Sequence, residues 1–149
     1  MTEIDLYELG RAPPERVLPK LLERVLERGK RAVVMVGSDE QVEALNAHLW
    51  TYAQRSFLPH GAAGDGFAED QPIYLTTTDE NPGGASVLIL LDEQDSSNIN
   101  DYDRCFEILD GSDPGAVERA RKRADAHRAA GHTVTYWRQR EGGGWDKAD

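Results

Sequence analysis

Three short apolar runs constrain the fold more than any other feature of the sequence. Residues 32–36 (AVVMV) and 86–91 (SVLILL) are almost entirely apolar, and residues 105–109 (CFEIL) follow the same pattern with one glutamate. A strand that reads as a continuous apolar run is usually covered on both faces, as in a parallel sheet. These runs therefore predict a mainly parallel sheet with helices packed against it.

Segments with helical spacing alternate with the apolar runs, and they are expected to start near Pro14, Ser38 and Pro114. Further strands are expected at residues 3–9, 72–77 and 133–139, the first of them with one solvent-facing side because apolar and polar residues alternate there. The prediction is one layered α/β domain with a mainly parallel sheet over residues 1–140. A loose tail is expected over residues 141–149.

The charge of the chain is negative overall but unevenly distributed. The formal net charge is −10, which argues against direct binding of a nucleic-acid backbone. Residues 114–140 nevertheless carry seven basic and two acidic residues, a local charge of +5. This segment is either the solvated face of a helix or a surface that binds an anion. The single cysteine and the absence of a long apolar stretch indicate a cytoplasmic protein that does not span a membrane.

One motif resembles part of a nucleotide site. The run VLILLDE over residues 87–93 has the pattern of a Walker B strand, whose acid holds magnesium next to a nucleotide. The matching phosphate loop would be Gly61–Gly66, which must be followed by lysine and then by serine or threonine. Phe67 and Ala68 stand at those two positions. We therefore expect no nucleotide site, and a nucleotide-binding or hydrolysing enzyme on a degenerate P-loop fold is the alternative.

Other catalytic or metal-binding patterns are not evident. The four histidines show no ligand spacing with Cys105, and the acidic loop at residues 92–103 lacks the glycine and the closing glutamate of a calcium loop. No G-x-S-x-G nucleophile turn is present. The expectation is a protein without catalytic residues, metal or cofactor.

An aromatic segment over residues 48–61 (HLWTYAQRSFLPHG) has two interpretations. Trp50 and Tyr52 could complete the core face of the preceding helix, with Phe57 at the sheet edge. Alternatively, some of the rings could form an apolar surface for recognition, since large rings provide contact area at low entropic cost. The residues alone favour the first interpretation for at least part of the group.

Several of these segments together resemble the chi subunit of bacterial DNA polymerase III, most closely the alphaproteobacterial type. The resemblance rests on Trp50, on SFLPHG, PIYLTT and NPGGA, and on AGHTVTYWRQ over residues 130–139. It implies a single three-layer α/β/α domain with a mainly parallel sheet, which is helicase-like or Rossmann-like but has no nucleotide site. It also implies a non-catalytic accessory subunit of the clamp-loader complex in DNA replication. The implied partners are the acidic C-terminal tail of single-stranded-DNA-binding protein and the psi subunit or another replisome or helicase protein.

The resemblance also implies which residues bind these partners. Trp50, Arg121 and Arg128 are expected at the tail-binding site, and Phe57 at the psi-type surface. The chain departs from the family at two tail-site positions, where Ala124 replaces an aromatic residue and Asp125 replaces a lysine. A third position, lysine in some members, is Val117.

Overall fold

The structure is a computed structural model that describes residues 2–10, 14–51, 61–62, 72–91, 93–140 and 144–148. Within these ranges eight strands form one sheet with the order β3-β4-β2-β5-β6-β1-β7-β8. Every neighbouring pair is parallel except β7 and β8, which are antiparallel. The strands are β1 (Glu3–Leu9), β2 (Ala32–Met35), β3 (Gly61–Ala62), β4 (Ile73–Thr76), β5 (Val87–Leu90), β6 (Arg104–Asp110), β7 (Thr133–Gln139) and β8 (Trp145–Lys147).

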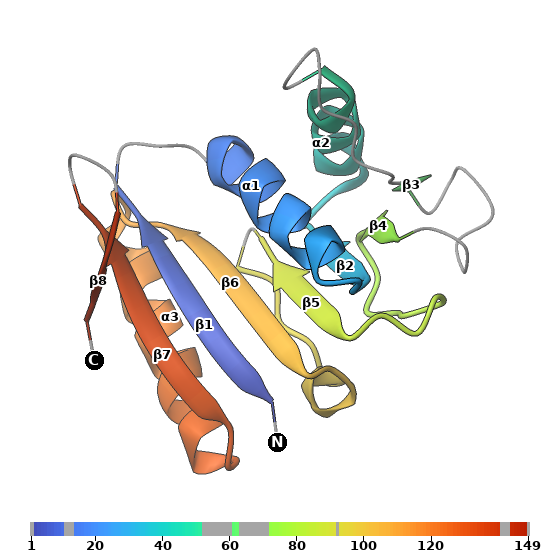
Figure 1. Cartoon of the computed structure of the whole chain (residues 1–149). Coiled ribbons are helices and arrows are strands. Elements are labelled where there is room, and N and C mark those ends of the chain that lie inside the picture. Colours follow the sequence, from blue (N-terminus) through green and yellow to red (C-terminus); the bar gives the residue numbers. More distant parts are fainter. Residues whose placement is uncertain are drawn as a thin grey trace.

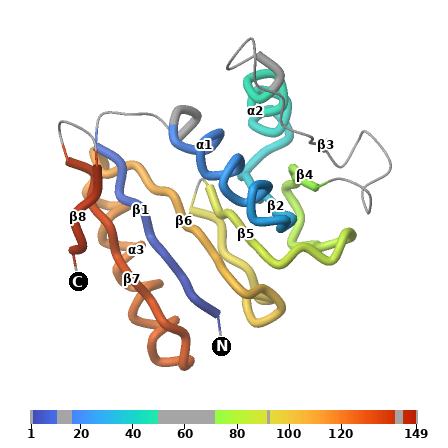
Figure 2. The backbone as a smooth tube through the Cα atoms, viewed as in Figure 1, coloured from blue at the N-terminus to red at the C-terminus, as the bar shows by residue number. Residues whose placement is uncertain are grey.

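The helices cover the sheet from both sides, as Figures 1 and 2 show. They are α1 (Pro14–Glu27), α2 (Asp39–Thr51) and α3 (Pro114–Ala129), with a 3-10 turn over Ile99–Asp101. Helices α1 and α2 share one apolar core with the sheet, and α3 packs with the 3-10 turn into a second core on the opposite face. The prediction of a three-layer α/β/α fold with a mainly parallel sheet is confirmed.

The apolar runs form the centre of the sheet. All four residues of β2 and all four of β5 are buried, and successive side chains belong to the two different cores. This alternation follows from strand geometry, in which neighbouring side chains point to opposite faces. Continuous apolar runs are needed because both faces are covered here.

Strand β1 differs from the expectation of one solvent-facing side. It lies between β6 and β7, and its carboxylates Asp5 and Glu8 are only 8% and 7% exposed. Asp5 forms an ion pair with Arg104 and accepts a hydrogen bond from Trp137 Nε1 at 3.1 Å. The expectation was wrong because the polar residues alternate along a central strand and are buried with partners instead of facing water.

The C-terminal segment also differs from the expectation. Within residues 141–149, which were predicted to be a loose tail, Trp145–Lys147 form the edge strand β8 on β7. The Trp145 ring packs edge-on against Tyr7 of β1, with 4.9 Å between the ring centroids. This contact gives the short strand an apolar anchor.

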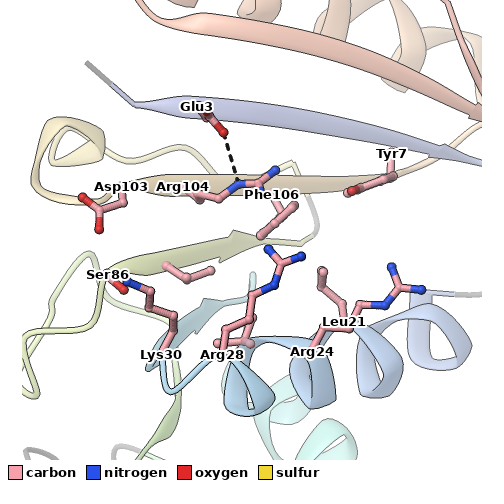
Figure 3. A pocket seen from close by; sticks show the side chains of 12 residues that line it. Glu3, Tyr7, Leu21, Arg24, Arg28, Lys30, Ser86, Asp103, Arg104 and Phe106 are labelled. Atoms are coloured by element: carbon pink, nitrogen blue, oxygen red, sulfur yellow. Dashed lines mark ion pairs between the residues drawn. The ribbon is translucent and has the colours of Figure 1, made fainter.

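Helix α1 leaves a pocket of about 590 Å³ between itself and strands β1, β5 and β6. Figure 3 shows side chains of α1 and of the strands that line it. This pocket lies on the opposite face of the sheet from α3.

Candidate partner-binding site

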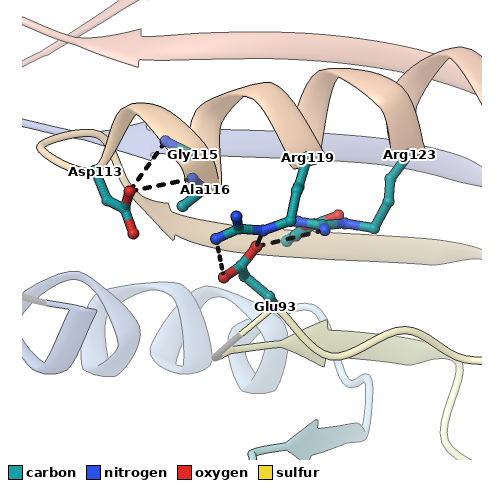
Figure 4. Close-up of polar contacts among 7 residues, drawn as sticks. Glu93, Asp113, Gly115, Ala116, Arg119 and Arg123 are labelled. Atoms are coloured by element: carbon teal, nitrogen blue, oxygen red, sulfur yellow. Dashed lines mark hydrogen bonds and ion pairs between the residues drawn. The ribbon is translucent and has the colours of Figure 1, made fainter.

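Helix α3 begins at a well-defined N-cap. The Asp113 carboxylate accepts hydrogen bonds from the backbone N–H groups of Gly115 and Ala116 at 3.0 and 3.4 Å (Figure 4). Pro114 occupies the first helical position, where its missing N–H has no intrahelical partner to lose. The helix start predicted near Pro114 is therefore confirmed.

The inner side of α3 is lined by small residues. Ala116, Ala120 and Ala124 recur every four residues and are all buried against the sheet. Such small side chains place the helix close to the strands, so that longer side chains point sideways and outward. The helix carries five cations and two carboxylates, namely Arg119, Arg121, Lys122, Arg123, Arg128, Glu118 and Asp125.

Two of these cations are held by carboxylates outside α3, Glu93 in the loop after β5 and Glu107 in β6. Arg119 binds Glu93 through two nitrogens, with N–O distances of 2.5 and 2.8 Å, and Arg123 donates from Nε to the buried Glu107 at 2.7 Å. The hydrogen bond from Arg119 holds the pKa of Glu93 below its ordinary value. Glu93 is the last residue of the Walker-like run, and its carboxylate is directed toward α3 (Figure 4).

Arg121 has a different environment. Its side chain is exposed, and its guanidinium carbon lies 4.9 Å from the centre of the Tyr136 ring, a cation–π contact. Among the residues that the structure describes, no carboxylate forms an ion pair with it. The Tyr136 hydroxyl donates to Glu8 at 2.8 Å, and Glu8 also accepts from Arg138 at 2.7 Å. The contact fixes the guanidinium without neutralising it.

Burial, together with the hydrogen bond to Glu8, raises the pKa of Tyr136, and Arg121 acts in the opposite direction. Tyr136 is therefore a neutral ring at physiological pH. A neutral phenol that is held by Glu8 provides a rigid support for the guanidinium.

Arg128 lies seven residues after Arg121, two turns further along the same side of the helix. It contacts Asp125 at 3.6 Å and the Val134 carbonyl at 3.4 Å. The structure thus brings together Arg121 and Arg128, two of the three residues predicted at the tail site.

Trp50 lies elsewhere in the fold. Its backbone belongs to α2, which packs on the opposite face of the sheet from α3, and its ring is not among the described side chains. The structure therefore does not bring Trp50 next to Arg121. Phe57, predicted at the psi-type surface, lies outside the described residues.

The departures from the family pattern have distinct structural settings. Ala124 is only 2% exposed and belongs to the core beneath α3, whereas Asp125 is exposed and pairs with Arg128. Val117 is half-buried and packs against the same core. Asp125 is therefore the departure that changes the outer surface.

Sequence reasoning missed Tyr136 and Glu8, which support Arg121. The two are separated by 128 positions and meet because β1 pairs with β7. The only signal in the sequence was that Tyr136 and Glu8 each lie in a segment that was predicted to be a strand.

Neither a metal-binding cluster nor a membrane-spanning helix occurs among the described residues. No group of three or more histidine, cysteine or acidic side chains there could hold a metal ion. Within the same ranges, every helix is too short or too polar to cross a membrane.

The comparisons with known proteins agree with one another. Residues 1–135 match the family described as "DNA polymerase III chi subunit, HolC". A "Probable DNA polymerase III subunit chi" of Rickettsia prowazekii (strain Madrid E) is 31% identical over 112 residues, which cover 73% of this chain and 68% of the relative. The "DNA polymerase III subunit chi" of Pseudomonas aeruginosa is 22% identical over 137 residues, or 90% of this chain and 94% of the relative.

Proposed function

Because this chain belongs to the family of DNA polymerase III chi subunits, we propose that it is a non-catalytic accessory subunit that links the polymerase to single-stranded-DNA-binding protein. In this proposal it works in the cytoplasm as part of the clamp-loader complex. Its ligand is the acidic, phenylalanine-ended tail of the binding protein. The outer side of α3, with Arg121 and Arg128, receives that tail.

The observation that carries this proposal is the state of Arg121. Arg119 and Arg123 are already paired with Glu93 and Glu107, and Lys122 and Arg128 have acidic neighbours on α3. Arg121 has no such partner among the described residues, and Tyr136 holds its guanidinium in place. A guanidinium in this state can grip a carboxylate through two parallel hydrogen bonds.

Asp125 sets the expected strength of binding. It lies one helical turn after Arg121 and places a negative charge where an acidic ligand would approach. It also pairs with Arg128, so a ligand carboxylate would compete with it. We expect modest affinity that decreases with salt, because exposed charges are screened beyond about 8 Å at physiological ionic strength.

A second partner surface at Phe57 is part of the proposal. Its support is the resemblance of SFLPHG to the family segment that receives psi. The partner would be the psi subunit or another replisome or helicase protein.

The test is a titration of a labelled acidic peptide that ends in a free phenylalanine carboxylate. Arg121→Ala should abolish measurable binding, while Asp125→Lys should strengthen it. Lys122→Ala is the matched control because it also removes one exposed positive charge from α3, but from a different side of the helix. It should bind nearly as well as the wild type.

Two outcomes would count against the proposal. If the wild type does not bind at low salt, this chain does not receive the tail. If Lys122→Ala loses as much affinity as Arg121→Ala, the peptide senses only the general charge of the helix and Arg121 is not an anchor.

A further inference from the structure

The pocket beside α1 lies on the face of the sheet that α3 does not cover. Its walls come from four elements that are distant in sequence, namely β1, α1, β5 and β6. Nothing in the proposed tail site uses it. Its chemistry is a cationic rim above an apolar floor.

The rim is formed by Arg24 in the last turn of α1 and by Arg28 and Lys30, which follow the helix. All three are exposed, and Figure 3 shows Arg24 and Arg28 extending from the helix toward the strands. The part of the chain that the structure describes offers none of them an ion-pair partner. In a chain with a net charge of −10, three cations around one pocket with no ion-pair partner among the described residues form a local site for an anion.

The floor of the pocket is apolar. Phe106 and Val25 are 6% and 5% exposed, and Tyr7 and Leu21 are half-buried against the same core. Tyr7 extends this floor toward Trp145 on β8 through their edge-on ring contact. A ligand that fits here needs a bulky apolar group next to its negative charges.

The ring contacts favour a peptide over a nucleic acid. Phe106 has the Arg104 guanidinium 4.9 Å from its centre and stacks with Tyr7 at a centroid distance of 5.9 Å. Tyr7 in turn meets the edge of Trp145. Bases bind single-strand proteins by stacking flat on open aromatic faces. Phe106, which is 6% exposed and contacts both Arg104 and Tyr7, offers no such face, whereas the half-exposed Tyr7 can still contact an apolar side chain.

The acidic side chains at one end of the pocket also favour a peptide over a nucleic acid. Glu3 and Asp103 line that end, and they would repel a continuous phosphate backbone. A peptide can place its carboxylates on the rim and leave only uncharged groups next to Glu3 and Asp103. We propose that the pocket binds an acidic peptide segment of another protein, with carboxylates on Arg24 and Arg28 and one large apolar side chain on the Tyr7–Phe106 floor.

The experiment uses a dye-labelled peptide of alternating aspartate and leucine or phenylalanine residues, amidated at its C-terminus. The amide removes the terminal carboxylate that the tail site on α3 requires. Fluorescence anisotropy with the full chain should show binding at low salt. A second peptide with serine at every apolar position should bind more weakly, because it cannot fill the floor.

Arg28→Glu should weaken binding of the first peptide by about tenfold or more, since it turns an attraction for the peptide carboxylates into a repulsion. Lys20→Glu is the matched control, because it makes the same charge change at an exposed position of α1 that does not line the pocket. It should change the affinity by less than about twofold. Circular dichroism would verify that both variants remain folded.

The proposal fails if the wild type does not bind the first peptide, or if Arg28→Glu binds it as well as the wild type does. It also fails if Lys20→Glu loses as much affinity, since net charge would then explain the binding. Tighter binding of a labelled oligothymidylate that depends on Arg28 would instead identify a nucleic-acid surface.

Discussion

Glu107 shows how this protein keeps a charge inside its sheet. The residue lies in the middle of β6 and is 2% exposed, with Arg123 of α3 as its hydrogen-bonded partner. Burial raises the pKa of Glu107 above its ordinary value of 4.5, and Arg123 opposes the rise. The pair therefore joins α3 to the sheet at the cost of desolvating a carboxylate.

We expect Arg123→Ala to lower the free energy of unfolding by about 3–5 kcal/mol, because it leaves a buried carboxylate without its partner. Urea denaturation at neutral pH measures the change. The same substitution in a Glu107→Gln background should cost much less, because no buried charge then remains. Equal losses in the two backgrounds would show that Arg123 acts through packing alone.

The loss of unfolding free energy caused by Arg123→Ala should also depend on pH. Without Arg123, the folded-state pKa of Glu107 rises further above its unfolded value. A raised carboxyl pKa penalises the fold at high pH, and the penalty disappears as pH falls toward the unfolded value. The difference from the wild type should therefore shrink from about pH 8 to about pH 4.5.

Arg121 marks the limit of sequence reasoning for single residues. Its role was predicted from the resemblance to the family, and the structure shows the exposed guanidinium that this role needs. Its support by Tyr136 and Glu8 could not be predicted, because strand pairing brings these residues together across 128 positions. The same applies to Glu93, whose contact with Arg119 of α3 joins residues 26 positions apart.

At the scale of elements, the packing of α3 on the sheet depends on the small residues along the inner side of this helix. Ala120 and Ala124 are 0% and 2% exposed, so the helix rests directly on the strands. The aromatic residue that the resemblance to the family implies at position 124 could not be accommodated here without moving the helix. The close packing of α3 on the sheet therefore accounts for the absence of an aromatic residue at position 124.

We expect Ala124→Tyr to destabilise the fold by about 1–3 kcal/mol, because an inserted ring overpacks a filled core. Ala126→Tyr is the matched control on the exposed side of the same helix and should have little effect. Thermal unfolding of both variants makes the comparison. Equal stability of Ala124→Tyr and the wild type would mean that the ring turns outward, and tail-peptide affinity would then be expected to rise.

Other elements show where local patterns fail. Helix α1 continues from Pro14 through Pro19 to Glu27, although Pro19 removes one backbone hydrogen bond. The fully buried Leu18 and Leu22 beside it show that packing outweighs this loss. Strand β8 was missed because its three residues follow a glycine run and are too short to show a period.

At the scale of the whole molecule, the apolar runs predict the layers but not the strand order. The first strand lies sixth in the sheet, between β6 and β7, and no local pattern specifies that position. This order assembles both candidate surfaces, since β1 contributes Glu8 to the α3 side and Tyr7 to the pocket beside α1. Neither surface could be assembled from the sequence without the pairing.

The sheet separates the two proposed surfaces, and this separation leads to a prediction that depends on both proposals. The tail peptide on α3 and the amidated peptide beside α1 should bind one molecule at the same time, because their sites lie on opposite faces. Saturation with one peptide should change the Kd of the other by less than about twofold, since coupling requires each ligand to favour a different state of a shared element. Titration with two different dyes measures both affinities in one sample. Displacement of one peptide by the other would show that they share a site, and the assignment of separate surfaces would then be wrong.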